Sequence, residues 1–454
     1  MSPTRSVPSA FMATASPAAA ASPRPMRSTL SASAKRRSAA RSPPATTSSP
    51  RYACWRAGWP ARRRRWPGCV PAFDAPPLMH IVQTIASIAE RDGGPARTIR
   101  DLCEALARAG ARVTLVARHD PARDGALLRP DPALVTTLLV PGRLPDFTAA
   151  IRPLDADVIH DNGLWSPANI AAGAAARRLG LPLVLTPHGM LEPWALAWHR
   201  RRKQLAWALY QRRLLGQARL LVATAAPEAA AIAALLPGKP VALVPNGVAC
   251  PPLPDRSERA AATGRTLLSL SRLHPKKNLP GLVTAWGQLA PRFPDWTLQI
   301  SGPDEGNHGA ALAAQVARLG LGDRVRLTGS ITEAAKPALF AAADLFVLPS
   351  FSENFGITVA EALAAGVPVV ATTGTPWASL VTQNCGWQVG TDPDSLAAAL
   401  ATAMQLSPAD RTAMGARGHA MVQRDFGWAA IAARMLDSYG RVMQGAREPD
   451  PMHA

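Results

Sequence analysis

Residues 349–372 read PSFSENFGITVAEALAAGVPVVAT, and this segment carries most of the information about the architecture. Glu353 and Glu361 are separated by seven residues, with Gly356 between them. The pattern predicts a loop that ends at Gly356 and a helix that begins near 357–358. Glu353 then lies in the loop, and Glu361 lies one turn into the helix. Unpaired N–H groups at a helix N-terminus favour an anionic ligand, and adjacent carboxylates can accept hydrogen bonds from sugar hydroxyls. The segment therefore predicts a site for a phosphorylated sugar.

A second segment, SRLHPKKNL at 271–279, follows an expected strand at 266–270 and precedes an expected helix. Ligands of α/β sheets bind at the carboxyl ends of the strands, which is where this segment falls. Arg272 and Lys277 can both reach a diphosphate, the arginine as a fork and the lysine as a point charge. Lys276 is a further cation that could share the role of Lys277. The alternative interpretation is a solvated basic turn.

Together, the two segments resemble motifs of retaining glycosyltransferases with the two-domain GT-B architecture, the family called group 1 or family 4. Glu353 and Glu361 match the E-x7-E motif, and residues 271–278 are similar to the G-R-L-x-x-x-K-G motif. Ser271 replaces the first glycine of that motif and Asn278 replaces the second. Asparagine tolerates positive φ better than most residues, so the second replacement is mild.

The resemblance covers Met79 to about Gly445, where short apolar runs alternate with segments of helical period. This alternation is typical of an α/β protein with parallel sheets. The expected strands are 79–84, 112–117, 157–160, 182–186, 220–223 and 241–244, followed by 266–270, 296–301, 324–328, 344–348 and 367–371.

The resemblance implies two Rossmann-like lobes, the first binding the acceptor and the second the nucleotide sugar. The expected parts are an N-terminal domain at 79–247, a linker at 248–264, a C-terminal domain at 265–427, and a final helix and tail at 428–454. In the family, the final helix often crosses back onto the first lobe.

Residues 1–78 differ in composition from the rest of the chain. They contain 13 of the 50 Lys and Arg residues but one of the 31 acidic residues, so they supply most of the net charge of +19. Ala, Ser, Pro and Arg in irregular order predict a disordered extension. We expect Met79 to be the native start. The alternatives are an organellar transit peptide, or a nucleic-acid-binding arm around the arginines at 62–65.

A departing nucleoside diphosphate needs its developing charge stabilised by a metal or by fixed cations and helix ends. By resemblance, Arg272 and Lys277 hold the diphosphate and act catalytically on the leaving group. Members of the family generally work without a bound metal, so no metal ligands and no cofactor are expected. Asp155 and Asp157 form a D-x-D pair, but both are expected to cap a turn before a strand.

The resemblance also assigns ligand contacts within the first segment. Glu353 is expected to bind hydroxyls of the transferred sugar, and Glu361 is expected to bind the ribose. Backbone N–H groups at Phe355, Gly356 and Ile357 would fix the sugar and the phosphate.

Several residues at other strand ends are candidates by resemblance. His188, after the strand 182–186, is the candidate for contacting the sugar or orienting the acceptor, with a structural histidine as the alternative. His160 could line the acceptor site. Gly93 and Gly94 form a loop that would meet the donor phosphate, and backbone near Gly329 would meet the base.

Residues 194–215, WALAWHRRRKQLAWALYQRRLL, combine aromatic and basic side chains. Such a helix can lie on an anionic membrane surface, and many relatives act on lipid-linked glycans. The alternative is a helix with one packed and one solvated face. Five dispersed cysteines fit a reducing compartment, and we expect a cytoplasmic protein, with peripheral contact at the inner membrane face left open.

The sequence predicts a glycosyltransferase that uses a UDP-, GDP- or ADP-sugar and a glycan or lipid-linked acceptor in polysaccharide or glycolipid synthesis. Two alternatives stay open: a sugar-nucleotide 2-epimerase of the same fold, and a nucleic-acid-binding protein acting through residues 1–78. The sequence identifies neither the sugar, the base, the acceptor nor the oligomeric state.

Overall fold

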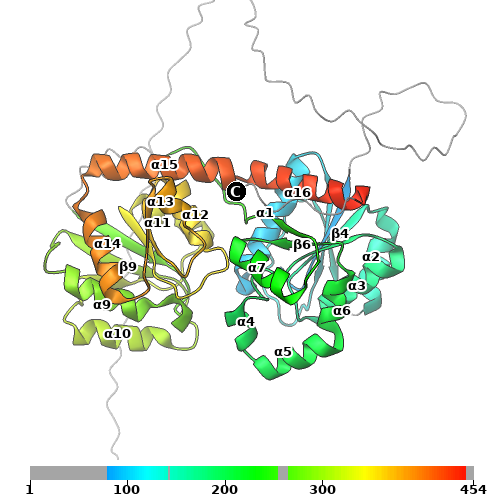
Figure 1. The fold of residues 1–454 in the computed structure, drawn as a ribbon, viewed down its shortest axis with the longest axis horizontal. Helices are drawn as coiled ribbons and strands as arrows, with labels where there is room; N and C mark the ends of the chain where they lie inside the picture. The colour runs from blue at the N-terminus through cyan, green and yellow to red at the C-terminus, as the bar shows by residue number, and fades with distance from the viewer. Residues whose placement is uncertain (1–78, 142–143, 254–263, 446–454) are drawn as a thin grey trace, which may run out of the picture. The chain divides into compact units, whose positions relative to one another are not determined.

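The computed structural model describes residues 79–141, 144–253 and 264–445 (Figure 1). The basic segment at 1–78, most of the expected linker and the last nine residues lie outside the described part of the chain. The described residues form two parallel sheets, each covered by helices on both faces. Two Rossmann-like lobes are therefore confirmed.

The first lobe contains a seven-stranded sheet with the strand order β3-β2-β1-β4-β5-β6-β7, and every neighbouring pair is parallel. Its strands are β1 (His80–Ile85), β2 (Arg112–Arg118), β3 (Thr136–Val140), β4 (Val158–Asn162), β5 (Leu183–Thr186), β6 (Leu220–Ala223) and β7 (Val241–Leu243). Its α-helices are α1 (Gly94–Arg108), α2 (Leu144–Ile151), α3 (Pro167–Leu179), α4 (Pro193–Ala197), α5 (Arg200–Ala206), α6 (Arg212–Gln217) and α7 (Ala226–Leu235).

The second lobe contains a six-stranded parallel sheet with the order β10-β9-β8-β11-β12-β13. Its strands are β8 (Arg265–Leu270), β9 (Trp296–Ser301), β10 (Val325–Leu327), β11 (Leu345–Leu348), β12 (Val369–Thr372) and β13 (Gly386–Val389). The α-helices of this lobe are α9 (Leu279–Leu289), α10 (His308–Arg318), α11 (Lys336–Ala341), α12 (Ile357–Ala364), α13 (Ser379–Thr382), α14 (Pro393–Gln405) and α15 (Pro408–Phe426), and α16 (Trp428–Gln444) follows them. In both sheets the order in which strands are added reverses beside the first strand, between β1 and β4 and between β8 and β11. α/β proteins bind ligands at this switch point.

The strands are apolar on both sides because helices cover both faces of each sheet. Ile81 and Val82 are adjacent in β1, and they pack into different hydrophobic clusters on opposite faces of the first sheet. Val347 and Phe346 divide in the same way between the two clusters of the second sheet. A continuous apolar run is therefore the sequence pattern that these central strands require.

Helix α16 joins the core of the first lobe although it follows the second lobe in sequence. Ile431, Met435 and Tyr439 lie in the same buried cluster as Ile81 of β1. The Tyr439 hydroxyl lies 2.6 Å from Nδ1 of His160, so a polar contact also connects this helix to β4.

Two strands, β3 and β13, were absent from the sequence prediction. Both lie at an edge of their sheet, and the side chains of β13 are half-buried. An edge strand is less enclosed, so TTLLV and GWQV do not show the apolar run that marks a central strand.

The segment 194–215 contains one break in its helical path, at 198–199. Trp198 ends α4 in an extended conformation, and His199 has φ 56° before α5 begins. A π-helix at Trp207–Gln211 then connects α5 to α6. The expected helix is therefore formed over 200–217, with a π-helical turn in its middle, and the break at 198–199 separates it from α4.

Candidate functional site

The two motif segments meet at the switch point of the second sheet. Strands β8 and β11 are neighbours, so the loops that follow Leu270 and Leu348 leave the same edge of the sheet side by side. The Phe351 N–H donates to the Lys276 carbonyl at 2.9 Å, which joins the loops directly. Topology thus brings together residues that are more than 70 positions apart in the sequence.

Lys277 and Glu353 form an ion pair at this junction. Lys277 Nζ lies 2.5 Å from Glu353 Oε1, and the two side chains are only 14% and 10% exposed. The Ser350 hydroxyl donates to the same carboxylate oxygen at 2.6 Å. A pair removed from water this far carries a large desolvation cost, so the contact by itself is weak evidence for a stabilising role.

Asn278 supplies the backbone conformation that the family motif obtains from glycine. Its φ is 52°, in the left-handed region, and its side-chain amide donates to the Thr391 carbonyl at 2.7 Å. The replacement of the second motif glycine is therefore accommodated locally.

Arg272 lies apart from the pair. Its guanidinium contacts Glu305 at 2.7 Å, and the two side chains are 59% and 50% exposed. Exposed ion pairs contribute about 0–1 kcal/mol, so exchanging Glu305 for a ligand phosphate costs little.

Helix α12 begins at Ile357, where the sequence placed it. Gly356 caps it with φ 76°, and a Cβ at this position would lie 3.3 Å from Leu348 and from Trp377. The Phe355 side chain is buried against Trp377, whose indole N–H donates to the Phe355 carbonyl at 2.6 Å. The Phe355 side chain therefore belongs to the hydrophobic core of the second lobe.

Glu361, one turn into α12, has one paired and one unpaired carboxylate oxygen. Oε1 accepts from Lys336 at 2.8 Å, and Lys336 also contacts Glu333 at 3.1 Å. Oε2 is buried and has no hydrogen-bond partner among the described residues. Burial raises the pKa of Glu361, and the charge of Lys336 opposes this shift. A ligand hydroxyl would reach this oxygen only after neighbouring side chains move, because the oxygen is enclosed by protein.

The predicted glycines lie in a loop or at the start of a helix, with open space where a side chain would be. Gly93 has φ 72° and caps α1, and Gly94 is the first residue of that helix. Gly329 has φ 69°, and its carbonyl accepts from the Gly302 N–H at 2.7 Å. A Cβ at Gly93, Gly94 or Gly329 would meet nothing within 4 Å.

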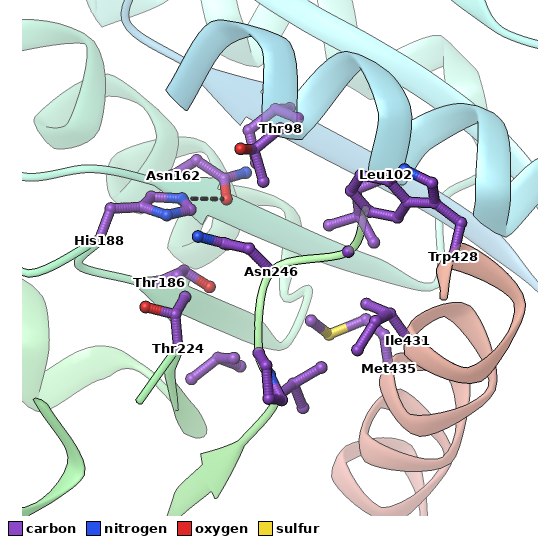
Figure 2. A pocket seen from close by; sticks show the side chains of 15 residues that line it. Thr98, Leu102, Asn162, Thr186, His188, Thr224, Asn246, Trp428, Ile431 and Met435 are labelled. Atoms are coloured by element: carbon purple, nitrogen blue, oxygen red, sulfur yellow. Dashed lines mark hydrogen bonds between the residues drawn. The ribbon is translucent and has the colours of Figure 1, made fainter. Parts of the chain in front are cut away.

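His188 lies in a turn after β5 with φ 53°, and Gly189 follows with φ 77°. Its Nε2 lies 3.1 Å from Asn162 Oδ1, and burial lowers the pKa of the ring to about 4, so the imidazole is neutral near pH 7. Figure 2 shows His188 lining a small cavity together with Asn246 and Trp428. The cavity volume is about 20 Å³. That volume suits a water molecule and not a sugar.

The structure corrects the interpretation of His160. It is fully buried, with Nδ1 near Tyr439 and Nε2 2.7 Å from the Thr186 hydroxyl. Both ring nitrogens have protein partners, so His160 supports the fold and does not line an acceptor site. Asp157 accepts from the His80 N–H at 2.8 Å, and Asp155 ends a short 3-10 helix, as expected for turn residues. Among the described residues, no cluster of His, Cys, Asp or Glu could hold a metal ion.

The sequence analysis missed Glu228, which holds the turn that carries His188. Its carboxylate is completely buried and accepts a hydrogen bond from the Gly189 N–H. It also accepts from the N–H and the hydroxyl of Thr224, both at 2.8 Å. The T-A-A-P-E sequence at 224–228 indicates a helix start, but no local pattern reveals the contact with Gly189.

Asn354, next to Glu353, contacts the same buried carboxylate of Glu228. With its nitrogen oriented toward the carboxylates, its amide donates to Glu192 at 3.1 Å and to Glu228 at 3.2 Å. Burial raises the pKa of Glu192 to about 7; the charge of Lys276 opposes the shift, and the nearby carboxylates add to it. The loop that carries Glu353 and the turn that carries His188 are therefore linked by hydrogen bonds.

Comparisons with known families match both lobes. The family described as "Glycosyl transferases group 1" matches residues 255–421, and the family described as "Glycosyltransferase Family 4" matches residues 92–250. A D-inositol 3-phosphate glycosyltransferase of Kineococcus radiotolerans is 30% identical over 402 residues, which are 78% of this chain and 91% of that protein. A GDP-mannose:cellobiosyl-diphosphopolyprenol alpha-mannosyltransferase of Xanthomonas campestris is 29% identical over 65% of this chain and 76% of its own length.

Solved structures share the fold at lower identity. A sucrose-phosphate synthase of Thermosynechococcus elongatus superposes with a TM-score of 0.63 at 22% identity, covering 81% of this chain and 100% of that one. Anabaena HepE in complex with UDP and glucose superposes with a TM-score of 0.62 at 21% identity, covering 80% and 99%.

Glu228→Ala is expected to lower the free energy of unfolding by about 2–4 kcal/mol, because the buried N–H groups of Gly189 and Thr224 lose their acceptor. Urea denaturation followed by circular dichroism measures the loss. Glu305→Ala removes an exposed carboxylate and serves as the control, with an expected change within about 0.5 kcal/mol. Equal losses in the two variants would contradict the role assigned to Glu228.

Proposed function

This chain belongs to the group 1 glycosyltransferases, and from that premise we propose that it transfers a sugar from a nucleoside-diphosphate sugar to an acceptor hydroxyl with retention of configuration. The observation that carries the proposal is the buried Lys277–Glu353 pair at the switch point of the second sheet. A cation for a diphosphate and a carboxylate for sugar hydroxyls are already adjacent there. The first turn of α12 begins four residues after Glu353.

Each part of the donor has a matching group. Lys277 and Arg272 would hold the diphosphate, with Arg272 leaving its exposed partner Glu305. Glu353 would accept hydrogen bonds from the transferred sugar, and the unpaired oxygen of Glu361 would accept one from the ribose. Gly329 would contact the base, and Gly93 and Gly94 would contact the phosphate. The space beside each of these glycines is open, which is compatible with a ligand there.

The proposed reaction occurs on one face of the sugar. The bond between the anomeric carbon and the diphosphate oxygen breaks, and a bond from the acceptor oxygen forms on the same face. The acceptor proton passes to the departing phosphate oxygen. Lys277, Arg272 and the N–H groups at the start of α12 stabilise the developing charge, so the proposal needs no metal. His188 lies in the turn that Glu228 holds through the Gly189 N–H, and it would orient the acceptor.

The comparisons support a nucleotide-sugar donor. The Xanthomonas relative is named for GDP-mannose and a diphosphopolyprenol acceptor, and HepE was solved with UDP-glucose. On this basis we propose a glycan or lipid-linked acceptor, in polysaccharide or glycolipid synthesis.

The segment 194–215 supports peripheral contact with a membrane. Trp198, Leu205 and Leu209 are 59%, 62% and 70% exposed, and the arginines at 200–202 are exposed beside them. Exposed apolar side chains among cations suit an anionic membrane surface. No helix in the described part of the chain is long and apolar enough to cross a bilayer.

Lys277→Ala or Glu361→Ala is expected to lower turnover at least about 100-fold, which corresponds to roughly 2.7 kcal/mol of lost transition-state stabilisation. Release of nucleoside diphosphate from the sugar donor measures turnover, and circular dichroism checks folding. Arg318→Ala removes an exposed cation at the end of α10 and is expected to retain turnover within about twofold. Near wild-type turnover in folded Lys277→Ala would overturn the site assignment.

Product analysis in the same assay separates the alternative activity. A transferase forms glycosylated acceptor in step with free nucleoside diphosphate. A 2-epimerase would release nucleoside diphosphate and an epimerised sugar without any acceptor.

The Leu205→Ser/Leu209→Ser double variant is expected to bind vesicles containing phosphatidylglycerol at least about fivefold more weakly than the wild type, because burying two leucines supplies part of the affinity. Cosedimentation at two salt concentrations measures binding. Both proteins carry the basic residues 1–78, so the difference between them reports on the segment. Equal binding by the two would remove this contact from the proposal.

A further inference from the structure

A pocket of about 450 Å³ lies in the first lobe, outside the donor site. Its apolar walls are formed by Trp165, Leu196, Trp207 and Leu235. Trp165 follows β4, while the other three come from α4, the π-helix and α7. The volume lies within the usual range for small-molecule sites, and two indole rings offer faces for packing.

The charged residues that line this pocket are both cations, Arg200 and Lys203. Lys203 is partly buried; its Nζ donates to the Ala195 carbonyl at 2.5 Å and lies 5.7 Å from the centre of the Trp165 ring. Burial lowers the pKa of Lys203. Among the described residues, neither cation has a carboxylate partner within ion-pair distance, so the pocket has unbalanced positive charge and suits an anion.

Trp165 is held in an unusual conformation by the π-helix. Its φ is 70°. Its backbone N–H donates to the Gln211 side-chain oxygen at 3.0 Å, and its backbone carbonyl accepts from the Tyr210 hydroxyl at 3.0 Å. The Trp165 indole N–H and the Gln211 amide nitrogen are buried without partners among the described residues. Strained residues and π-helices both concentrate at functional sites, which is consistent with a site here.

Neighbouring residues of the chain connect the pocket to the loop of Glu353 in the proposed donor site. Pro193 lines it, and the preceding residue, Glu192, contacts Asn354 beside Glu353. Helix α4 has five residues and is about 7.5 Å long, and Pro193, Leu196 and Ala197 along it all line the pocket. A ligand in the pocket would therefore contact a segment whose preceding residue, Glu192, touches the loop of Glu353.

We propose that this pocket binds an organic phosphate, with the phosphate held by Arg200 and Lys203 and the attached group packed against Trp165 and Trp207. The ligand is the acceptor or a part of it, and that assignment rests on the proposed function. The phosphate could come from a lipid phosphate or from a soluble sugar phosphate. The apolar walls favour the lipid source.

Isothermal titration calorimetry of the full chain with decyl phosphate, below its critical micelle concentration, tests the proposal. Wild-type protein is expected to bind decyl phosphate and not decanol. Lys203→Met and Arg200→Gln are each expected to weaken binding at least about fivefold, because each removes a charge-assisted contact. Arg201→Gln is the matched control, since Arg201 is exposed on the same helix but does not line the pocket. Its affinity is expected to stay within about twofold of the wild type.

Glucose 6-phosphate in the same titration identifies the source of the phosphate. Weaker binding than decyl phosphate supports a lipid phosphate, and equal or tighter binding supports a soluble sugar phosphate in the same pocket. No binding of either ligand, or equal weakening by Arg200→Gln and Arg201→Gln, would overturn the proposal. UDP binding is measured in parallel and involves no pocket residue. A loss of decyl phosphate binding with UDP binding intact would therefore count against the pocket alone. A lack of UDP binding would count against the proposed glycosyl transfer.

Discussion

The pairing of β8 with β11 is the constraint on which the candidate site depends. Because parallel neighbours end at the same edge of a sheet, the loop with Lys277 and the loop with Glu353 must leave the sheet together. The ion pair at 2.5 Å and the start of α12 at Ile357 both follow from this topology. The proposed phosphate site thus depends on strand order, and the side chains of the two loops would supply its chemistry.

The buried carboxylates of the first lobe extend this arrangement. Glu228 is completely buried and costs free energy to desolvate, and hydrogen bonds from Gly189 and Thr224 offset that cost. Asn354 contacts both Glu192 and Glu228, so the position of the Glu353 loop depends on the turn with His188. The loop that carries Glu353 and the turn that carries His188 are therefore connected through one amide side chain.

The sequence predicted what local pattern controls. The loop before Ile357, the left-handed conformation at Asn278 and the buried central strands each follow from a few neighbouring residues. Edge strands β3 and β13 escaped prediction because they lack a continuous apolar run. The contact of Glu228 with Gly189, the full burial of His160 and the pairing of Arg272 with Glu305 join residues distant in sequence, and no spacing rule reveals them.

The most direct test is a thermal-shift measurement of the full chain with UDP, GDP and ADP in EDTA, comparing wild type with Lys277→Ala. The account predicts that one nucleotide raises the melting temperature of the wild type, and that the shift is largely lost in the variant because the diphosphate loses its buried cation. An equal shift in both proteins, or a shift in the wild type only when Mg²⁺ replaces EDTA, would contradict a metal-independent donor site built on Lys277.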